Sequence, residues 1–281
     1  EMVGRAMASV TSGNGPFCKD AEELLAGMHP GSSALLTPSC SSALELAARL
    51  VGFQPGDEVI VPSFTFVTTV SSFVTNGATP VFCDIDSETL GLDVHKAESL
   101  ITERTRAICL VHYAGVPADP LGFADLAERY NLVLIEDNAH GLGGLSGGKT
   151  LGTFGAMSTL SFHETKNISC GEGGALIINN PELLARAEIL REKGTDRSQF
   201  LRGQVDKYTW VDDGSSWVLS DVLASILVAQ LHRFQELQSA RRSVWMRYFE
   251  ELYTWAKESG VSMQGRDLSN TAHLFYLIFP G

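Results

Sequence analysis

Short apolar runs rich in β-branched residues alternate with segments of helical period between about residue 33 and residue 180. This alternation predicts a mostly parallel sheet covered by helices, and therefore an α/β fold with three layers. Strands are predicted at residues 34–37, 58–61, 79–83, 107–111, 132–136, 157–161 and 174–178. Helices are predicted at residues 41–51, 67–75, 93–100, 120–129 and 181–192, with Gly52 ending the first of them.

After residue 219 the pattern changes to one or two long amphipathic helices over residues 220–257. Their aromatic face suits packing between domains or subunits, and it consists of Phe234, Trp245, Tyr248, Phe249 and Trp255. Residues 273–279 predict the opening strand of a second domain. We therefore predict a large domain at residues 1–219, followed at 220–281 by linking helices and the start of a small α+β domain. Because no initiator methionine is present and the last strand has no predicted partner, we expect both ends to be cut.

Composition and charge narrow the class of protein. The chain has 281 residues, of which 44% are hydrophobic and 19% charged, as in a globular protein. Its formal net charge of −12 argues against a nucleic-acid partner, which would require a clustered basic surface. No apolar run approaches the roughly 18 to 20 residues that span a bilayer, and the first ten residues do not resemble a signal peptide. A cytoplasmic enzyme is expected.

Cysteine and histidine positions predict neither disulfides nor a metal site. Five cysteines are scattered singly, as reduced thiols would be. The seven histidines show no metal-ligand spacing, and those that follow apolar runs are more often packed or hydrogen-bonded than ligating.

Polar residues follow three of the predicted strands, at the sheet edge where ligands of parallel sheets bind. These residues are Ser39, Cys40, Ser41 and Ser42 after the first strand, Glu136 and Asp137 after the fifth, and His163, Glu164 and Lys166 after the sixth. A carboxylate, a lysine and a helix start rich in amides together suit pyridoxal phosphate. An aspartate keeps the pyridine nitrogen protonated, a desolvated lysine bonds to the aldehyde, and helix amides stabilise the phosphate dianion.

Each of these signals has a plain structural alternative. A buried aspartate is more often a cap or an ion-pair partner, a lone lysine more often lies on a solvated face, and a serine-rich helix start is usually only an N-cap. From the residues alone, both interpretations stay open: a pyridoxal-phosphate site, and purely structural roles for the same side chains.

Five motifs in fixed order resemble the DegT/DnrJ/StrS family of sugar-nucleotide aminotransferases, a branch of the fold-type I pyridoxal-phosphate enzymes. They are Pro62-Ser63-Phe64-Thr65-Phe66, Val111-His112-Tyr113-Ala114-Gly115, Glu136-Asp137 with Ala139-His140, Ser161-Phe162-His163-Glu164-Thr165-Lys166-Asn167, and Gly171-Glu172-Gly173-Gly174. The tract at residues 191–210 resembles the subgroup that makes dTDP-4-amino-4,6-dideoxygalactose for enterobacterial common antigen and related surface glycans.

The resemblance implies a role for each matching residue. Lys166 is implied as the Schiff-base lysine and catalytic acid and base, and Asp137 as the partner of the pyridinium nitrogen. His140 falls where a Gln or His contacts the cofactor, and Phe66 where an aromatic ring stacks on it, although either residue could simply be packed. Phosphate contacts are implied for Cys40, Ser41 and Ser161.

Further contacts are implied across a homodimer with shared active sites. Ser216 stands where the family often has an Asn that reaches the neighbouring subunit's phosphate, and a hydroxyl can also donate there. The cations Arg191, Lys193, Arg197, Arg202 and Lys207 suit a pyrophosphate-bearing substrate, although the first two also fit a solvated helix end. Arg197, Arg202, Lys207 and Tyr208 are the predicted substrate residues.

The implied reaction moves an amino group from glutamate, through the cofactor, to dTDP-4-keto-6-deoxyglucose. One alternative is an aminotransferase for another keto sugar nucleotide, with a 3-keto group or a UDP carrier, or a dehydratase. Because dehydratases of the family replace the lysine with histidine, the presence of Lys166 favours transamination. Another alternative is a non-catalytic regulator on the same fold.

Overall fold

The structure is a computed structural model that describes residues 1–266 and 269–280. Positions 267, 268 and 281 of the predicted segment 220–281 lie outside the described residues. Among the residues described, no helix combines the length and the apolar character needed to cross a lipid bilayer.

In the described part of the chain, seven strands form one mostly parallel sheet with the order β1-β9-β8-β5-β4-β2-β3. They are β1 (Ser33–Thr37), β2 (Glu58–Pro62), β3 (Thr79–Cys83), β4 (Thr105–Val111), β5 (Val133–Asp137), β8 (Met157–Ser161) and β9 (Gly174–Ile178). Only β9 runs antiparallel to its neighbours in this sheet. The carboxyl ends of the other six strands therefore share one edge.

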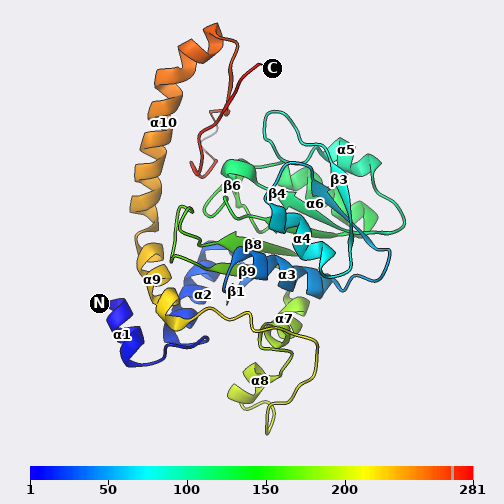
Figure 1. Cartoon of the computed structure of the whole chain (residues 1–281), viewed down its shortest axis with the longest axis vertical. Coiled ribbons are helices and arrows are strands. Elements are labelled where there is room, and N and C mark those ends of the chain that lie inside the picture. The colour runs from blue at the N-terminus through cyan, green and yellow to red at the C-terminus, as the bar shows by residue number, and fades with distance from the viewer. Residues whose placement is uncertain (267–268, 281) are drawn as a thin grey trace.

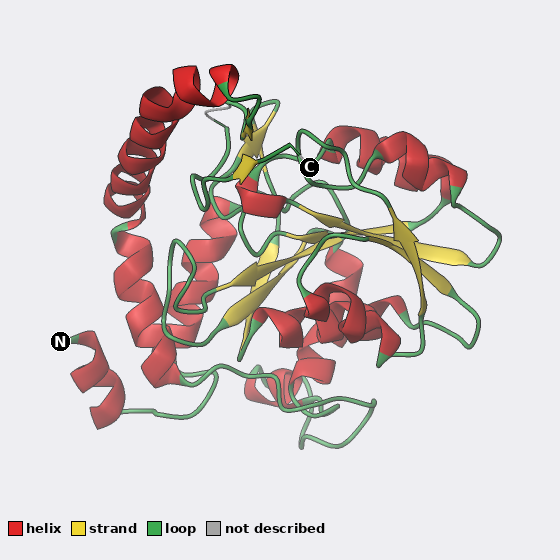
Figure 2. Ribbon diagram, turned by 45° about the horizontal axis from the view of Figure 1, so that its top comes forward, coloured by secondary structure: helices red, strands yellow, loops and turns green. Residues whose placement is uncertain are grey.

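Helices cover both faces of the sheet, which gives the three layers that the pattern predicts (Figures 1 and 2). One face carries α3 (Cys40–Val51), α4 (Val67–Val74) and α7 (Leu184–Arg191). The other carries α5 (Val94–Ser99) and α6 (Pro120–Tyr130) over β2, β4 and β5, with α2 (Pro16–Met28) and α9 (Asp221–His232) over β1, β8 and β9.

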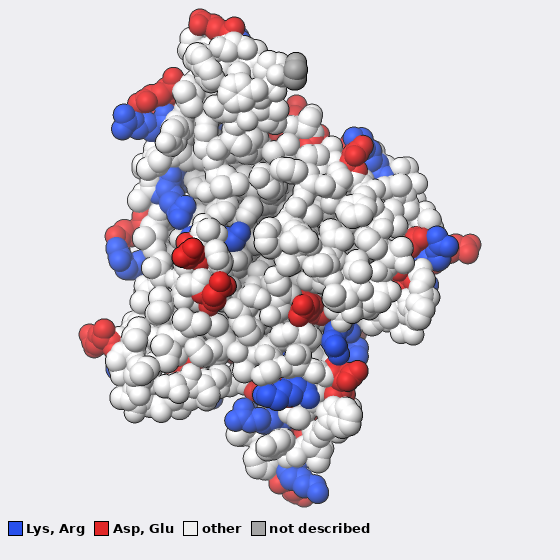
Figure 3. All heavy atoms as spheres, viewed as in Figure 1, with Lys and Arg blue, Asp and Glu red and all other residues white. Residues whose placement is uncertain are grey.

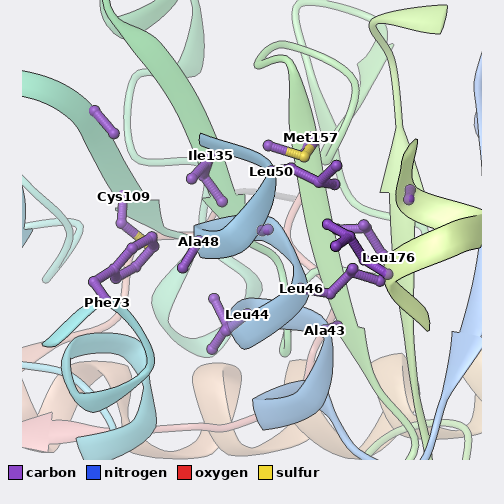
Figure 4. Packing of buried hydrophobic residues seen from close by; sticks show 14 of the residues in the cluster. Ala43, Leu44, Leu46, Ala48, Leu50, Phe73, Cys109, Ile135, Met157 and Leu176 are labelled. Carbon is purple, nitrogen blue, oxygen red and sulfur yellow. The ribbon is translucent and has the colours of Figure 1, made fainter. Parts of the chain in front are cut away.

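Alternation along the strands explains how one sheet serves two cores, because successive side chains point to opposite faces. Leu35 belongs to the cluster under α3, whereas its neighbour Leu36 packs under α2 and α9. Figure 4 shows side chains of α3 beside residues of the sheet, with Leu46 near Leu176 and Leu50 near Met157. Helix α3 ends at Gly52 as predicted, because that residue adopts φ 73°, which suits glycine.

Smaller elements complete the described fold. They are α1 (Met2–Ala8), η1 (Tyr113–Gly115), the hairpin of β6 (Leu145–Ser146) and β7 (Lys149–Thr150), η2 (Pro181–Leu183), α8 (Arg197–Leu201), α10 (Phe234–Glu258), and the paired strands β10 (Ser262–Met263) and β11 (Leu277–Ile278). Residues 220–257 thus form two helices that meet at Arg233.

The structure corrects some of the predicted elements. Strand β5 extends to Asp137, so this carboxylate belongs to the strand itself. The expected helix at 181–192 begins as a 3-10 turn at Pro181, and only its later part is α-helical. The expected strand at 273–279 is shorter and is not without a partner: it pairs with β10, and Phe275 before it packs on Trp245 of α10 at a ring-centroid distance of 5.7 Å. The division into domains at residue 219 stays a prediction.

Candidate active site

A cavity of about 670 Å³ opens at the carboxyl edge of the sheet. Its walls come from the turns after β1, β2, β4, β5 and β8, together with the residues just before β9. This edge is where a parallel sheet exposes its strand ends to a ligand. The predicted site residues that line the cavity are Phe66, Cys40, Ser41, Asp137, His140, Ser161 and Lys166.

Asp137 presents a buried carboxylate to this cavity and is only 6% exposed. Its Oδ2 accepts a hydrogen bond from Thr69 Oγ1 at 2.8 Å, and its Oδ1 accepts one from the Ala139 N–H at 3.2 Å. Burial raises the pKa of Asp137, and these two hydrogen bonds and the charge of Lys166 oppose the rise. Thr69 was not predicted as a site residue. It lies on the first turn of α4, with its hydroxyl also 2.8 Å from that of Thr65, and no local sequence pattern marks it as the partner of Asp137.

Lys166 enters the cavity from the loop between β8 and β9. Burial lowers the pKa of its amine, while the nearby Cys40 and Asp137 act in the opposite direction. A lowered pKa increases the fraction of free amine, which is the nucleophilic form. The Schiff-base role of Lys166 stays a prediction, with which its place in the cavity and its lowered pKa agree.

The start of α3 lines the same cavity as Lys166. Ser39 caps this helix, since its Oγ accepts a hydrogen bond from the Ser42 N–H at 3.1 Å. Cys40 and Ser41 then form the first turn, at the end of the helix dipole that attracts anions. The turn lies directly on Gly174 of β9, where an added Cβ would come within 2.4 Å of Cys40 N. Glycine in this motif thus permits the close approach that places the turn.

His140 has a fixed tautomer. Its Nδ1 accepts a hydrogen bond from the Ala114 N–H at 3.1 Å, so the ring hydrogen is on Nε2. Burial, together with the charges of His273 and Lys166, lowers the pKa of His140 to about 2. A neutral ring with an Nε2–H donor is the form that can replace a glutamine amide, which fits the family position where either residue occurs.

The aromatic side of the cavity is formed by Phe64, Phe66 and Tyr113. Phe66 is 71% exposed, so it is not a core residue and offers a free ring face to a flat ligand. Phe64 lies against Tyr113 with their ring centroids 4.9 Å apart.

A buried hydrogen-bonded pair of side chains supports the floor of the site. His112 and Glu136 are both fully buried, and His112 Nε2 lies 2.9 Å from Glu136 Oε2. Glu136 also accepts the N–H groups of Gly152, Phe154 and Gly155 at 2.7 to 2.9 Å. Although burial raises the pKa of Glu136, these hydrogen bonds outweigh it and the pKa is lowered. His112 is thus a hydrogen-bonded histidine, as its place after an apolar run predicts.

The predicted substrate residues do not line this cavity. Arg197 pairs with Glu192 at 3.2 Å, and Arg202 pairs with Glu188 at 2.7 Å. Lys207 and Tyr208 lie exposed in the loop after α8, and Ser216, also exposed, forms an isolated β-bridge with Glu192. Lys and Arg side chains gather over α8 and its loop at the lower end of the face in Figure 3. Arg191 is different, because its guanidinium is buried against Glu22 and the Leu36 carbonyl. The substrate and cross-subunit roles of the exposed residues stay predictions.

The lining groups fit pyridoxal phosphate one by one. A tuned amine suits its aldehyde, a buried carboxylate suits its ring nitrogen, a helix N-terminus suits its phosphate and an exposed phenyl ring suits its face.

Comparisons with known proteins agree with this geometry. GDP-perosamine synthase of Caulobacter vibrioides is 37% identical over 238 residues, which are 85% of this chain and 62% of that protein. The solved structure of Spr1654 from Streptococcus pneumoniae in its PLP form is 27% identical, with a TM-score of 0.88 over 98% of this chain and 74% of that one. Helicobacter pylori PseC, an aminotransferase involved in the biosynthesis of pseudoaminic acid, is 26% identical, with a TM-score of 0.90 over 99% of this chain and 74% of that one.

The chain spans about 62% of the length of the curated relative named above. The family model for DegT/DnrJ/EryC1/StrS aminotransferases matches residues 1–281. The chain belongs to the DegT/DnrJ/EryC1/StrS aminotransferase family.

Proposed function

We propose that this protein is a pyridoxal-phosphate-dependent aminotransferase that acts on a nucleotide-linked keto sugar. The observation that carries the proposal is the convergence of Lys166, Asp137 and the start of α3 on one cavity. The family and the PLP form of a structural relative support the cofactor, and the relative that makes GDP-perosamine supports a sugar nucleotide as substrate.

The residues of the chain divide the work of transamination. When bound, pyridoxal phosphate supplies an aldehyde that bonds to amines and a ring that accepts electrons from a deprotonated carbon. Lys166 Nζ would hold the cofactor before reaction. Once released, the same amine would move the proton between the reacting carbon of the substrate and the cofactor carbon that bore the aldehyde. Asp137 keeps the ring nitrogen protonated through its carboxylate, which Thr69 holds in place.

Two further residues orient the cofactor in this proposal. His140 donates its Nε2–H without gaining a charge, because its Nδ1 is already engaged with Ala114. Phe66 covers one face of the ring and excludes water there. Ser41 and Ser161 add hydroxyl donors at the phosphate, beside the amides of the α3 start.

For the substrate, we propose dTDP-4-keto-6-deoxyglucose as acceptor and glutamate as donor, giving dTDP-4-amino-4,6-dideoxygalactose for surface polysaccharides. The tract at 191–210 supports this choice by its resemblance to the corresponding subgroup. A GDP-linked sugar is the second candidate, since the relative from Caulobacter vibrioides is a GDP-perosamine synthase.

We also propose a homodimer that shares its active sites. Large apolar side chains stand exposed around the loop after α8, namely Leu201, Tyr208, Trp210 and Val211. Patches of this kind usually mark an interaction surface. Sedimentation of the protein should give the mass of a dimer, and a fully active monomer would refute the shared site.

The direct test is amine transfer from ¹⁵N-glutamate to a panel of dTDP-, UDP- and GDP-linked keto sugars, with Lys166→Ala as the matched control. We expect labelled product from the dTDP-linked 4-keto sugar and none from the control. If the GDP-linked sugar is preferred, the proposed transamination stands and the nucleotide of the substrate is GDP. Absence of transfer to every sugar by a cofactor-loaded protein would favour a non-catalytic regulator.

A further inference from the structure

The extended segment at residues 271–276 docks onto the loop that carries Lys166 (Figure 1, red, between α10 and the sheet). Thr271 is fully buried, and its Oγ1 donates to the His140 carbonyl at 2.6 Å. Its own carbonyl accepts hydrogen bonds from Asn167 Nδ2 at 2.8 Å and from Gln238 Nε2. The segment rests on bare backbone at Gly115, where an added Cβ would lie 1.8 Å from Thr271 Oγ1.

His273 makes two contacts from this segment. Its ring stacks on the ring of His140, with centroids 4.1 Å apart and planes 29° from parallel. Its Nδ1 lies 2.8 Å from Oδ1 of Asn167, the residue that follows Lys166.

The hydrogen-bond network fixes which atom donates in the second contact. Asn167 Nδ2 faces two acceptors, the Thr271 carbonyl and Gln238 Oε1, so the opposite atom of this amide is its oxygen. His273 Nδ1 must therefore carry the hydrogen. Burial and the charges of Lys166 and Arg241 lower the pKa of His273 to about 4, which keeps the ring neutral at pH 7.

A second anchor acts on the same loop. Arg241 of α10 donates from Nη2 to the Lys166 carbonyl at 3.3 Å. The Lys166 carbonyl and the Asn167 side chain are thus each held by a residue more than 70 positions away in sequence. His273 itself does not belong to the cavity lining, so it reaches the site through His140 and Asn167.

We propose that His273 is a positioning residue for the active site: its ring fixes the plane of His140, and its Nδ1–H holds Asn167 and with it the backbone of Lys166. The effect of His273 on catalysis rests on the proposed function, whereas its holding of His140 and of the Lys166 loop does not. The segment at 271–276 therefore supports the site from behind, through His140 and Asn167, without lining the cavity itself.

The test compares three variants of the whole protein that separate the two contacts. His273→Asn keeps an N–H donor near the Nδ1 position and loses the ring, His273→Phe keeps a ring and loses the donor, and His273→Ala loses both. His95→Ala, a histidine exposed on α5, is the matched control. Two readouts are followed: hydrogen exchange of the amides at 166–168 without cofactor, and the pH midpoint of the visible absorbance with pyridoxal phosphate bound.

We expect amide exchange at 166–168 to rise about three- to tenfold in His273→Ala and His273→Phe, as for loss of one hydrogen bond, and to stay near wild type in His273→Asn. The absorbance midpoint should shift in the variants that alter the stack, His273→Asn and His273→Ala. Unchanged exchange and an unchanged midpoint in His273→Ala would overturn the proposal. If His273→Ala fails to fold, equal exchange in His273→Asn and His273→Phe would overturn it instead. Faster exchange in a protein that does not bind the cofactor would keep the positioning role and reject the proposed function.

Discussion

Thr69→Val isolates the support of the Asp137 carboxylate. The substitution keeps the shape of the side chain and removes the hydroxyl that donates to Asp137 Oδ2 at 2.8 Å. A hydrogen bond to a charged group contributes about 1.5–3 kcal/mol, and both Thr69 and Asp137 are buried, so water does not replace the lost donor. We therefore expect the free energy of unfolding of the cofactor-free protein to fall by about 1.5–3 kcal/mol at pH 8.

The pH dependence has a definite sign. Burial already raises the pKa of Asp137, so the folded protein is penalised above that pKa and the penalty fades as pH falls through it. The loss caused by Thr69→Val should therefore be largest at pH 8 and smaller in acid, measured by urea unfolding at each pH. Thr68→Val is the matched control, because Thr68 lies on the same helix and lines the same cavity. Equal losses in the two variants, or a loss that grows in acid, would refute the reasoning.

Three further outcomes follow from the charged groups. Glu136→Gln should lower the free energy of unfolding by about 3–5 kcal/mol, because both oxygens of Glu136 already accept N–H donors. Since the pKa of Glu136 is lowered in the fold, this difference should be full above pH 4.5 and shrink as pH falls below it; a pH-independent difference in urea unfolding would contradict the account. Arg191→Met should lower the free energy of unfolding by a similar amount, about 3–5 kcal/mol, because the buried pair with Glu22 is lost. If the variant unfolds at the same temperature as the wild-type protein, Arg191 lies on a solvated face instead. Arg202→Ala should raise the KM for the sugar nucleotide far more than the KM for the donor, and equal changes would remove Arg202 from the substrate site.

The topology explains why the main site residues could be predicted. Asp137 is the last residue of one apolar strand and Lys166 lies after another, and a parallel sheet brings the carboxyl ends of such strands to one edge. The start of α3 follows the same rule after β1. Local sequence therefore carried enough information to place these groups in one cavity, although the family resemblance was needed to choose among their possible roles.

Contacts between distant segments were beyond the sequence pattern. Thr69 and His273 contribute through single hydrogen bonds and a ring stack, and nothing in the local period marks which side chain will meet Asp137 or Asn167. By its position Arg191 fits an exposed cation at the end of a helix, whereas in the structure it is buried in a pair with Glu22 of α2. Helix α2 itself was not predicted, although its amphipathic period begins at Pro16, a residue that favours the first turn of a helix.

The proposed function depends on a covalent bond between Lys166 and pyridoxal phosphate beside Asp137. Borohydride reduction of the cofactor-loaded protein, followed by proteolysis and mass spectrometry of the peptide that contains Lys166, measures this bond. We expect one added pyridoxyl phosphate group on Lys166, and none on that peptide in Lys166→Ala. A label on another lysine of the wild-type protein, or an unchanged yield of labelled protein in Lys166→Ala, would contradict the assignment.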